Sequence, residues 1–455
     1  MAEPLSPADL SAIQSERGPV HMHVGALCVF DGPVARETVV RRLRERIHLI
    51  PRYTMRLEKA PLGLVHPGWI EDESFDVEHH VRRAAVAAPG TDAELCELAG
   101  QTLSVPLDRE RPLWQITTVE GLARGRSALV AKMHHALVDG LAAVDVSTVI
   151  LDPTSEGLDV PPPEPRAPKA RHGPAGLDAL TRIAAAQLDL PRRLAREAVA
   201  RTSDPRIYAG QLRRAAGVVG ELARVRPQAP ATRLNVPIGR ERRVALARCR
   251  LEDVKQVRRA RDVTVNDVLL TTVALMLTDY LGEDIDHAVA LVPVSVRTEE
   301  ERGEGGNRIS TIFVDLPLAG DPLERLDQIN RATTAAKGSA QVQAGALIVG
   351  ATGLAPPPVS SLAVRAMSEP RMFNLVVSNV PGPQETFYLA GVPLLEVFPT
   401  VPLNPRNQAL SIGAVSYDGG VYFGLQADRD ALPDVSEAAA GLERAVRELV
   451  AAAGS

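Results

Sequence analysis

The chain has 455 residues, of which 45% are hydrophobic and 24% charged, and its formal net charge is -5. This length predicts more than one domain, and the slight acidity gives no electrostatic reason to expect nucleic-acid binding. The three cysteines, Cys28, Cys96 and Cys249, are too few and too widely spaced for a disulfide framework or a cysteine-rich zinc site. The polar N-terminus shows no signal peptide and no apolar run reaches about 18 residues, so we expect a cytoplasmic protein without a membrane-spanning helix.

Strands and helices are both predicted in the first half of the chain. Residues 20–30 alternate in part as a strand does, and the turn residues Asp31-Gly32-Pro33 follow. Residues 34–50 carry apolar side chains at helical spacing, and Pro51 ends that pattern. The other elements predicted here are a helix over residues 91–103 and strands over residues 115–120 and 127–133.

Two histidines and an acid follow the last of these strands in a segment that we call the histidine turn, residues 134–140. His134, His135, Asp139 and Gly140 lie between the apolar strand and a segment with helical spacing. Catalytic groups are commonly held in such turns at the ends of rigid elements. An imidazole, with a pKa of roughly 6.5, can take a proton from a hydroxyl and return it near neutral pH. A metal site and a purely structural turn are the alternatives, and no third cluster of ligands lies nearby in the sequence.

Several neighbouring positions have structural interpretations. Asp139 can pair with an arginine or cap the helix that follows, and Gly140 permits close packing or backbone angles that a side chain would prevent. His79 and His80 form a second histidine pair without an Asp-Gly turn, so we interpret them as structural or rim residues. Pro112-Leu113-Trp114 precedes a predicted strand, and we interpret it as a packing anchor that supports the histidine turn.

The middle of the chain predicts a linker and the second half another set of strands and helices. Residues 161–173 are rich in proline and arginine, as in an exposed linker. Helices with arginine-rich polar faces are predicted over residues 177–225, as either a solvated bridge or a surface for anionic lipid. Further strands are predicted over 244–251, 288–296, 309–316, 373–379, 410–417 and 421–427, and helices over 252–260, 264–281, 321–337 and 435–452. We therefore expect an α/β (α+β) fold with sandwich domains over 1–160 and 234–455, joined by a helical linker over 161–233.

The motif His134-His135-x-x-x-Asp139-Gly140 resembles the signature of the acyltransferase superfamily that includes chloramphenicol acetyltransferase, carnitine acyltransferases and peptide-synthetase condensation domains. The whole chain resembles one branch, the bacterial wax ester synthase/acyl-CoA:diacylglycerol acyltransferase family. Besides the histidine turn, the matches in the family's order are Met22-His23-Val24-Gly25, Pro112-Leu113-Trp114, Leu234-Asn235 with Pro237-Ile238-Gly239, Asn266-Asp267, Pro293-Val294-Ser295 with Arg297, Gly306-Asn307-Arg308, and Ser378-Asn379-Val380-Pro381-Gly382-Pro383.

This resemblance implies two chloramphenicol-acetyltransferase-like domains with an active-site tunnel between them. Acyl-CoA and the hydroxyl acceptor, diacylglycerol or a long-chain alcohol, would meet at His135, which would act as the general base. The implied reaction needs no covalent acyl-enzyme, no metal and no cofactor, because acyl-CoA is a co-substrate. Peripheral association with the inner membrane or with lipid inclusions is also implied, whereas the oligomeric state stays open.

The resemblance also suggests roles for further residues. His134 would orient or line the site, and Asp139 would be a structural acid with Arg297 as its ion-pair partner. Asn266 would position the substrate or stabilise the oxyanion, although it and Asp267 also lie where they could simply cap the helix over 264–281. The other positions expected to bind substrate or support the site are Ser295, Pro112, Trp114, Asn379 and Gly382.

Two departures from the family pattern leave the acceptor open. The segment after Pro7-Ala8-Asp9 lacks the expected aromatic residues, and Asn404 to Asn407 replaces a turn that usually contains glycine. The alternatives are therefore transfer to a non-lipid hydroxyl and a catalytically inactive relative that binds lipid. The intact histidine turn argues against the inactive relative.

Overall fold

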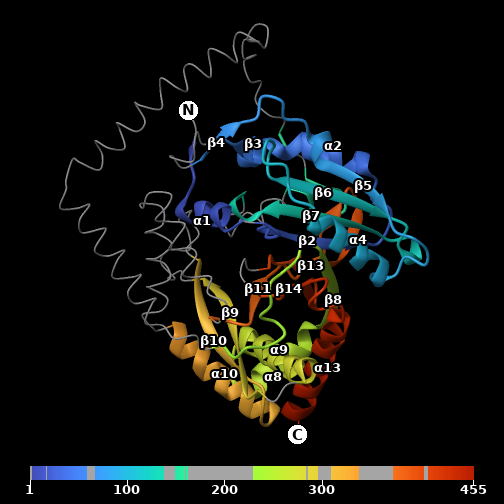
Figure 1. Ribbon diagram of the computed structural model, residues 1–455. Coiled ribbons are helices and arrows are strands. Elements are labelled where there is room, and N and C mark those ends of the chain that lie inside the picture. The colour runs from blue at the N-terminus through green and yellow to red at the C-terminus, as the bar shows by residue number, and fades with distance from the viewer. Residues whose placement is uncertain are drawn as a thin grey trace, which may run out of the picture.

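The computed structural model describes residues 3–16, 18–58, 67–137, 149–158, 160–161, 229–282, 285–295, 309–337, 372–403 and 408–454. These residues form two six-stranded sheets and one three-stranded sheet, with helices around them (Figure 1). None of the helices in the described ranges is long and apolar enough to cross a membrane.

The first six-stranded sheet contains most strands of the first half of the chain. Its order is β12-β13-β2-β7-β6-β5, with the bounds β12 Tyr388–Leu389, β13 Val392–Thr400, β2 His23–Phe30, β7 Ser127–His134, β6 Trp114–Glu120 and β5 Val81–Ala85. Side chains of β7 alternate between two cores: Leu129 packs with helix α2 (Arg36–Arg46), whereas Ala128 and Val130 pack with helix α4 (Asp92–Ser104). This period-2 pattern buries β7 on both faces, as its apolar sequence predicts.

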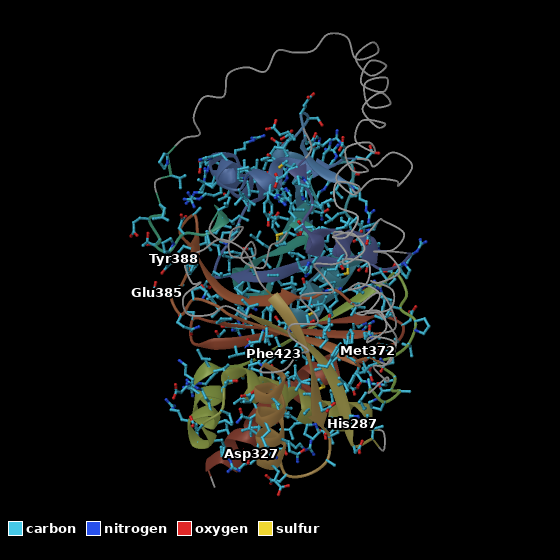
Figure 2. All side chains as sticks on the ribbon, turned by 90° about the vertical axis from the view of Figure 1, so that its left-hand side faces the viewer. His287, Asp327, Met372, Glu385, Tyr388 and Phe423 are labelled. Atoms are coloured by element: carbon cyan, nitrogen blue, oxygen red, sulfur yellow. The ribbon has the colours of Figure 1, made fainter. Side chains whose placement is uncertain are left out.

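The second six-stranded sheet belongs to the second half of the chain. Its order is β10-β9-β11-β14-β15-β8, with the bounds β10 Ile309–Pro317, β9 His287–Ser295, β11 Leu375–Pro381, β14 Leu410–Tyr417, β15 Gly420–Asp428 and β8 Arg242–Arg250. One large core joins this sheet to four helices, α8 Leu251–Arg261, α9 Val265–Leu281, α10 Pro322–Lys337 and α13 Val435–Gly454. In the view of Figure 2, Phe423 lies in the sheet and Asp327 in the helical layer below it.

The two halves are tied together by a strand that crosses between them. Strand β13 of the second half pairs antiparallel with β2 of the first, with Thr400 opposite Gly25. Arg248 of β8 adds ion pairs between the halves, because it contacts Asp92 of α4 at 2.9 Å and Glu396 of β13 at 2.8 Å. The sheet of the first half is therefore completed by residues from the second half. The expected boundaries at 160 and 234 stay a prediction.

Short elements complete the described fold. The three-stranded sheet has the order β1-β4-β3, with the bounds Glu3–Pro4, Gly68–Glu71 and Met55–Leu57. The remaining helices are α1 Pro7–Ser15, α3 Val77–His80, and the 3-10 turns η1 Ile47–Leu49, η2 Pro51–Thr54, η4 Ala123–Gly125 and η5 His135–Leu137.

Most elements lie where the sequence predicts them. The prediction missed α1, β5 and the pair β12–β13. Most of the expected linker, all of the helix expected after the histidine turn except its last residues, and the turn at Asn404 to Asn407 lie outside the described residues.

Candidate active site

Strand β7 carries the histidines, and its register with β2 decides what lies beside them. His134 pairs with His23, and Lys132 pairs with Gly25. A Cβ atom at Gly25 would lie 1.9 Å from the carbonyl oxygen of Ala131. Only glycine therefore lets β2 approach β7 this closely, and the approach brings His23 next to the histidine turn.

The ring of His134 is buried and faces protein atoms at both nitrogens. Its Nδ1 accepts a hydrogen bond from the backbone N–H of Ala136 at 3.0 Å. Its Nε2 lies 3.1 Å from Oε1 of Glu16, an ion-pair contact that is not a well-directed hydrogen bond. An accepting Nδ1 places the proton of the neutral ring on Nε2, facing the carboxylate.

His135 is oriented differently from its neighbour. Its backbone N–H donates to the carbonyl oxygen of Met22 at 2.7 Å, while its side chain keeps exposed surface. Even so, enough protein surrounds the ring that burial, together with the neighbouring His134, lowers its pKa. An accessible imidazole that is neutral at neutral pH can accept a proton.

Glu16 follows helix α1 and lies at the centre of a polar cluster. Its Oε1 accepts from the backbone N–H of Met22 at 2.7 Å, and its Oε2 accepts from Arg109 at 2.5 Å. Burial alone would raise the pKa of Glu16, but the contacts with His134, Arg109 and Met22 outweigh burial and hold the pKa at about 2. Glu16 is therefore a carboxylate at any working pH.

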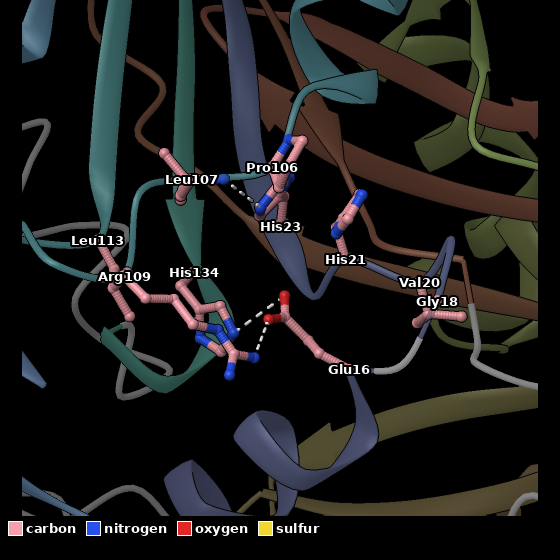
Figure 3. A pocket seen from close by; sticks show the side chains of 10 residues that line it. All are labelled: Glu16, Gly18, Val20, His21, His23, Pro106, Leu107, Arg109, Leu113 and His134. Atoms are coloured by element: carbon pink, nitrogen blue, oxygen red, sulfur yellow. Dashed lines mark hydrogen bonds and ion pairs between the residues drawn. The ribbon is translucent and has the colours of Figure 1, made fainter. Parts of the chain in front are cut away.

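A cavity of about 270 Å³ opens beside this cluster (Figure 3). Its lining is Glu16, Gly18, Val20, His21, His23, Pro106, Leu107, Arg109, Leu113 and His134. Figure 3 shows Glu16 at the end of α1, opposite His134 and Arg109, with His23 at the start of β2 and His21 on the segment just before that strand. The cavity thus reaches the buried side of the histidine turn.

Three side chains of this cavity lie close enough to share a metal ion. Glu16, His21 and His23 each offer a ligand atom, and these atoms lie within 4.8 Å of one another. However, both oxygens of Glu16 are already engaged by Met22 and Arg109, and Nε2 of His23 receives the N–H of Leu107 at 3.4 Å. The positive charge of Arg109 further disfavours a divalent cation here. We assign no metal to this cluster.

The Pro112-Leu113-Trp114 segment contacts the histidine turn through its backbone, and its aromatic ring packs on other parts of the first half. The carbonyl oxygen of Leu113 accepts from the N–H of His134 at 2.9 Å. Trp114 is buried, donates its Nε1–H to the carbonyl oxygen of Tyr53 at 2.8 Å and stacks on His80 with ring centroids 4.4 Å apart. His80 also contacts the Trp114 carbonyl through Nδ1 at 2.9 Å, and His79 is exposed. These contacts agree with the structural interpretation of the second histidine pair.

In the second half, Asp267 caps helix α9. One carboxylate oxygen accepts from the backbone N–H of Thr264 at 2.9 Å, and the other accepts from the hydroxyl of Thr333 at 2.7 Å. Asp267 is fully buried, so it joins α9 to α10 rather than offering a free carboxylate. Asn266 is half-buried in the same first turn. Of the two alternatives for this pair, the structure shows the cap for Asp267.

For the remaining expected site residues, the structure gives their positions on the strands but few side-chain contacts. Asn379 lies on β11 opposite Ala414, and Ser295 ends β9 opposite Ile309. At Gly382, a Cβ atom would lie 2.4 Å from the carbonyl oxygen of Ser416, so this glycine permits a close backbone approach. Asp139, Gly140 and Arg297 lie outside the described residues, and the expected ion pair between Asp139 and Arg297 stays a prediction.

The sequence interpretation missed Glu16, His21 and Arg109 as neighbours of the histidines. One local signal was available, because Ser6 and Asp9 form the capping box of α1, with Pro7 at its first turn. That signal predicts the helix but says nothing about its packing against η5. The long-range contact therefore could not be read from spacing.

Known proteins are similar to this chain over nearly its whole length. Residues 5–269 match the profile "Wax ester synthase/diacylglycerol acyltransferase catalytic domain", and residues 305–450 match "WS/DGAT C-terminal domain". Two Mycobacterium tuberculosis proteins described as probable diacylglycerol O-acyltransferases are similar. The tgs2 protein is 33% identical, with 97% of each chain covered, and tgs1 is 32% identical, covering 95% of this chain and 92% of that one.

Solved structures confirm the predicted fold class. The wax ester synthase/diacylglycerol acyltransferase of Marinobacter aquaeolei superposes with a TM-score of 0.69 at 28% identity, covering 99% of this chain and 100% of that one. A variant of the starter condensation domain of rhizomide synthetase superposes with a TM-score of 0.58 at 14% identity, covering 100% and 95%. The second likeness shows a shared fold only.

Proposed function

The chain belongs to the wax ester synthase/diacylglycerol acyltransferase family, and from this premise we propose that it moves a long-chain acyl group from acyl-CoA to the hydroxyl of diacylglycerol, of a long-chain alcohol, or of both. The family match and the similarity to the mycobacterial acyltransferases support an enzyme of this class. The identity of the acceptor hydroxyl is the more specific part of the proposal.

The observation that carries the mechanism is the difference between the two histidines. Both ring nitrogens of His134 face protein atoms, whereas His135 is an exposed residue. His135 is also held neutral by its lowered pKa. A base must be both accessible and unprotonated, so we assign this role to His135.

The proposed reaction then proceeds in two proton transfers. His135 takes the proton of the acceptor hydroxyl while the oxygen attacks the thioester carbonyl carbon. The tetrahedral intermediate expels the coenzyme A thiolate, and the ester carbonyl re-forms. The imidazolium returns its proton to that thiolate, so the enzyme ends unchanged. This route requires acyl-CoA as co-substrate and no resident cofactor.

The role proposed for Asn266 is to position the substrate or to stabilise the oxyanion of the intermediate. Its half-buried place in the first turn of α9 leaves its side chain partly accessible, while its neighbour Asp267 is occupied by the cap. Removing a single oxyanion donor typically lowers kcat by roughly 10²–10³-fold. The structural pairing of Asp139 with Arg297 remains part of the proposal on the strength of the resemblance.

We also propose that the protein takes its acceptor from a lipid surface by peripheral contact. The proposed acceptors are water-insoluble, so they partition into membranes or lipid inclusions. Flotation with phosphatidylcholine vesicles, with and without diacylglycerol, tests this contact. Protein that floats with the vesicles supports it, and protein that stays in the soluble fraction while turning over vesicle-borne diacylglycerol contradicts it.

The acceptor is tested by following coenzyme A release from palmitoyl-CoA with diacylglycerol, with hexadecanol or with neither. We expect release to depend on the acceptor and to match the amount of triacylglycerol or wax ester formed. Equal release without an acceptor would indicate a thioester hydrolase. No release by folded protein with either lipid would overturn the neutral-lipid proposal and leave a non-lipid hydroxyl or a binding role.

A further inference from the structure

We infer that Glu16 is a positioning residue for His135, acting through the residues on both sides of it. This inference rests on the proposed function, because it assigns the carboxylate a role in the same acyl transfer. Glu16 does not contact the ring of His135 in any described interaction. Its effect would instead come from two short chains of contacts that end at the backbone of the histidine turn.

The first chain runs through Met22, which joins Glu16 to the backbone of His135. Oε1 of Glu16 accepts from the Met22 N–H at 2.7 Å, and the Met22 carbonyl accepts from the His135 N–H at 2.7 Å. A single residue thus joins the carboxylate to the peptide group that carries the base. Strand β2 begins at the next residue, so the same contact also fixes where β2 enters the sheet.

The second chain runs through the ring of His134. The carboxylate of Glu16 lies 3.1 Å from Nε2, which favours the tautomer with the proton on Nε2. In that tautomer Nδ1 keeps a lone pair, and this lone pair accepts the N–H of Ala136 at 3.0 Å. With the proton moved to Nδ1, two donors would face each other and the contact with Ala136 would be lost. His134 and Ala136, which flank His135, are therefore both fixed by these contacts.

The charge of Glu16 suits this role. The side chain of Glu16 is only 10% exposed, whereas its partner Arg109 is 51% exposed at the rim of the cavity. The groups that face the carboxylate are His134 on β7, Arg109 on the preceding loop, and His21 and His23 on the adjoining segment. These four side chains are cationic or can become so, and no second carboxylate among the residues that line the cavity competes with Glu16 for them.

Two substitutions separate the charge of Glu16 from its two chains of contacts, which both begin at Oε1. In Glu16→Gln an amide oxygen at the Oε1 position can still accept from Met22 and face Nε2 of His134, but the amide NH2 at the Oε2 position cannot accept from Arg109, and the negative charge is gone. Glu16→Ala removes both chains. Glu97→Gln on α4 is the matched control, because it also removes one negative charge and its side chain is 46% exposed in a pair with Arg429.

Kinetics and hydrogen exchange together test the inference. We expect Glu16→Ala to lower kcat by about 10²-fold, the cost of a small misplacement of a catalytic group, with little change in KM, and Glu16→Gln to lose less because its amide oxygen can keep both contacts of Oε1. A positioning role through His134 also predicts that the losses of Glu16→Ala and His134→Asn combine to less than their product, whereas independent effects would multiply. An unchanged kcat in Glu16→Ala, in an active wild type, would overturn the inference.

Hydrogen exchange provides a result that does not depend on turnover. The amides of His135 and Ala136 are both bonded, so we expect faster exchange in a peptide covering residues 133–137 for Glu16→Ala. A peptide from the β14–β15 hairpin should be unchanged, which distinguishes local release from unfolding. Unchanged exchange in the first peptide refutes the positioning role even if no acceptor is found, whereas an inactive wild type refutes only the proposed function.

Discussion

The burial of His23 makes the stability of this protein fall in mild acid. The side chain is 2% exposed, and its Nδ1 has no hydrogen-bond partner in the described part of the chain. Burial, and then the nearby ammonium group of Lys132, lower the pKa of His23 from 6.5 to about 3. The folded protein therefore keeps this ring neutral over a range in which the unfolded chain protonates it.

The sign and size of the effect follow from proton linkage. Below pH 6.5 the unfolded state binds one more proton than the folded state at this residue, so the free energy of unfolding decreases as the pH falls towards 3. A full proton corresponds to about 1.4 kcal/mol per pH unit, and His23 alone should cost about 2 kcal/mol between pH 6.5 and 4.5. His23→Gln keeps an acceptor for the N–H of Leu107 but cannot titrate, so this part of the slope should disappear.

Urea unfolding at pH 6.5, 5.5 and 4.5, followed by tryptophan fluorescence, measures the slope. Trp69 and Trp114 are the only tryptophans in the chain and both are buried in the first half, where His23 lies. His79→Gln, a change at an exposed histidine, should show the same slope as the wild type. A slope for His23→Gln as steep as that of the wild type would refute the reasoning.

Two further predictions concern an ion pair and the proposed base. Arg46, 1% exposed, contacts the fully buried Asp152 at 2.7 Å, so Arg46→Ala should lower the free energy of unfolding by about 3–5 kcal/mol. Arg44→Ala, a 54% exposed position on the same helix, should cost less than about 1 kcal/mol in the same urea experiment, and equal losses would contradict this. For His135, the lowered pKa predicts that kcat/KM is lost only below pH 6.5, and an acid limb centred above pH 6.5 would contradict a base that is neutral at neutral pH.

The elements around the histidines could be predicted because their signals are local. The apolar run of β7 predicts a strand that is buried on both faces, and Pro51 marks the end of the helical segment over 34–50. His79 and His80 could be interpreted as structural or rim residues, because only the pair His134 and His135 is followed by an Asp-Gly turn. The packing role of Trp114 was likewise predictable from its place at the start of a strand.

The cluster around Glu16 could not be predicted, because it depends on contacts between distant segments. Helix α1 has a clear N-terminal signal, but nothing in residues 7–15 specifies that its end delivers Glu16 to His134. Similarly, the alternation within β13 does not reveal that this strand pairs with β2 of the other half. Such pairings are decided by the packing of whole sheets rather than by residue spacing.

The assignment of His135 as the base is tested most directly by comparing acyl transfer in the wild type, His135→Ala and His134→Asn. Asparagine at position 134 can still accept the N–H of Ala136 through its side-chain oxygen, so the turn is conserved in that variant. With the preferred acceptor and palmitoyl-CoA, His135→Ala should lose roughly 10²–10⁴-fold in kcat, with an unchanged urea midpoint, and His134→Asn should lose less. A folded His135→Ala variant that retains the wild-type kcat would contradict the account.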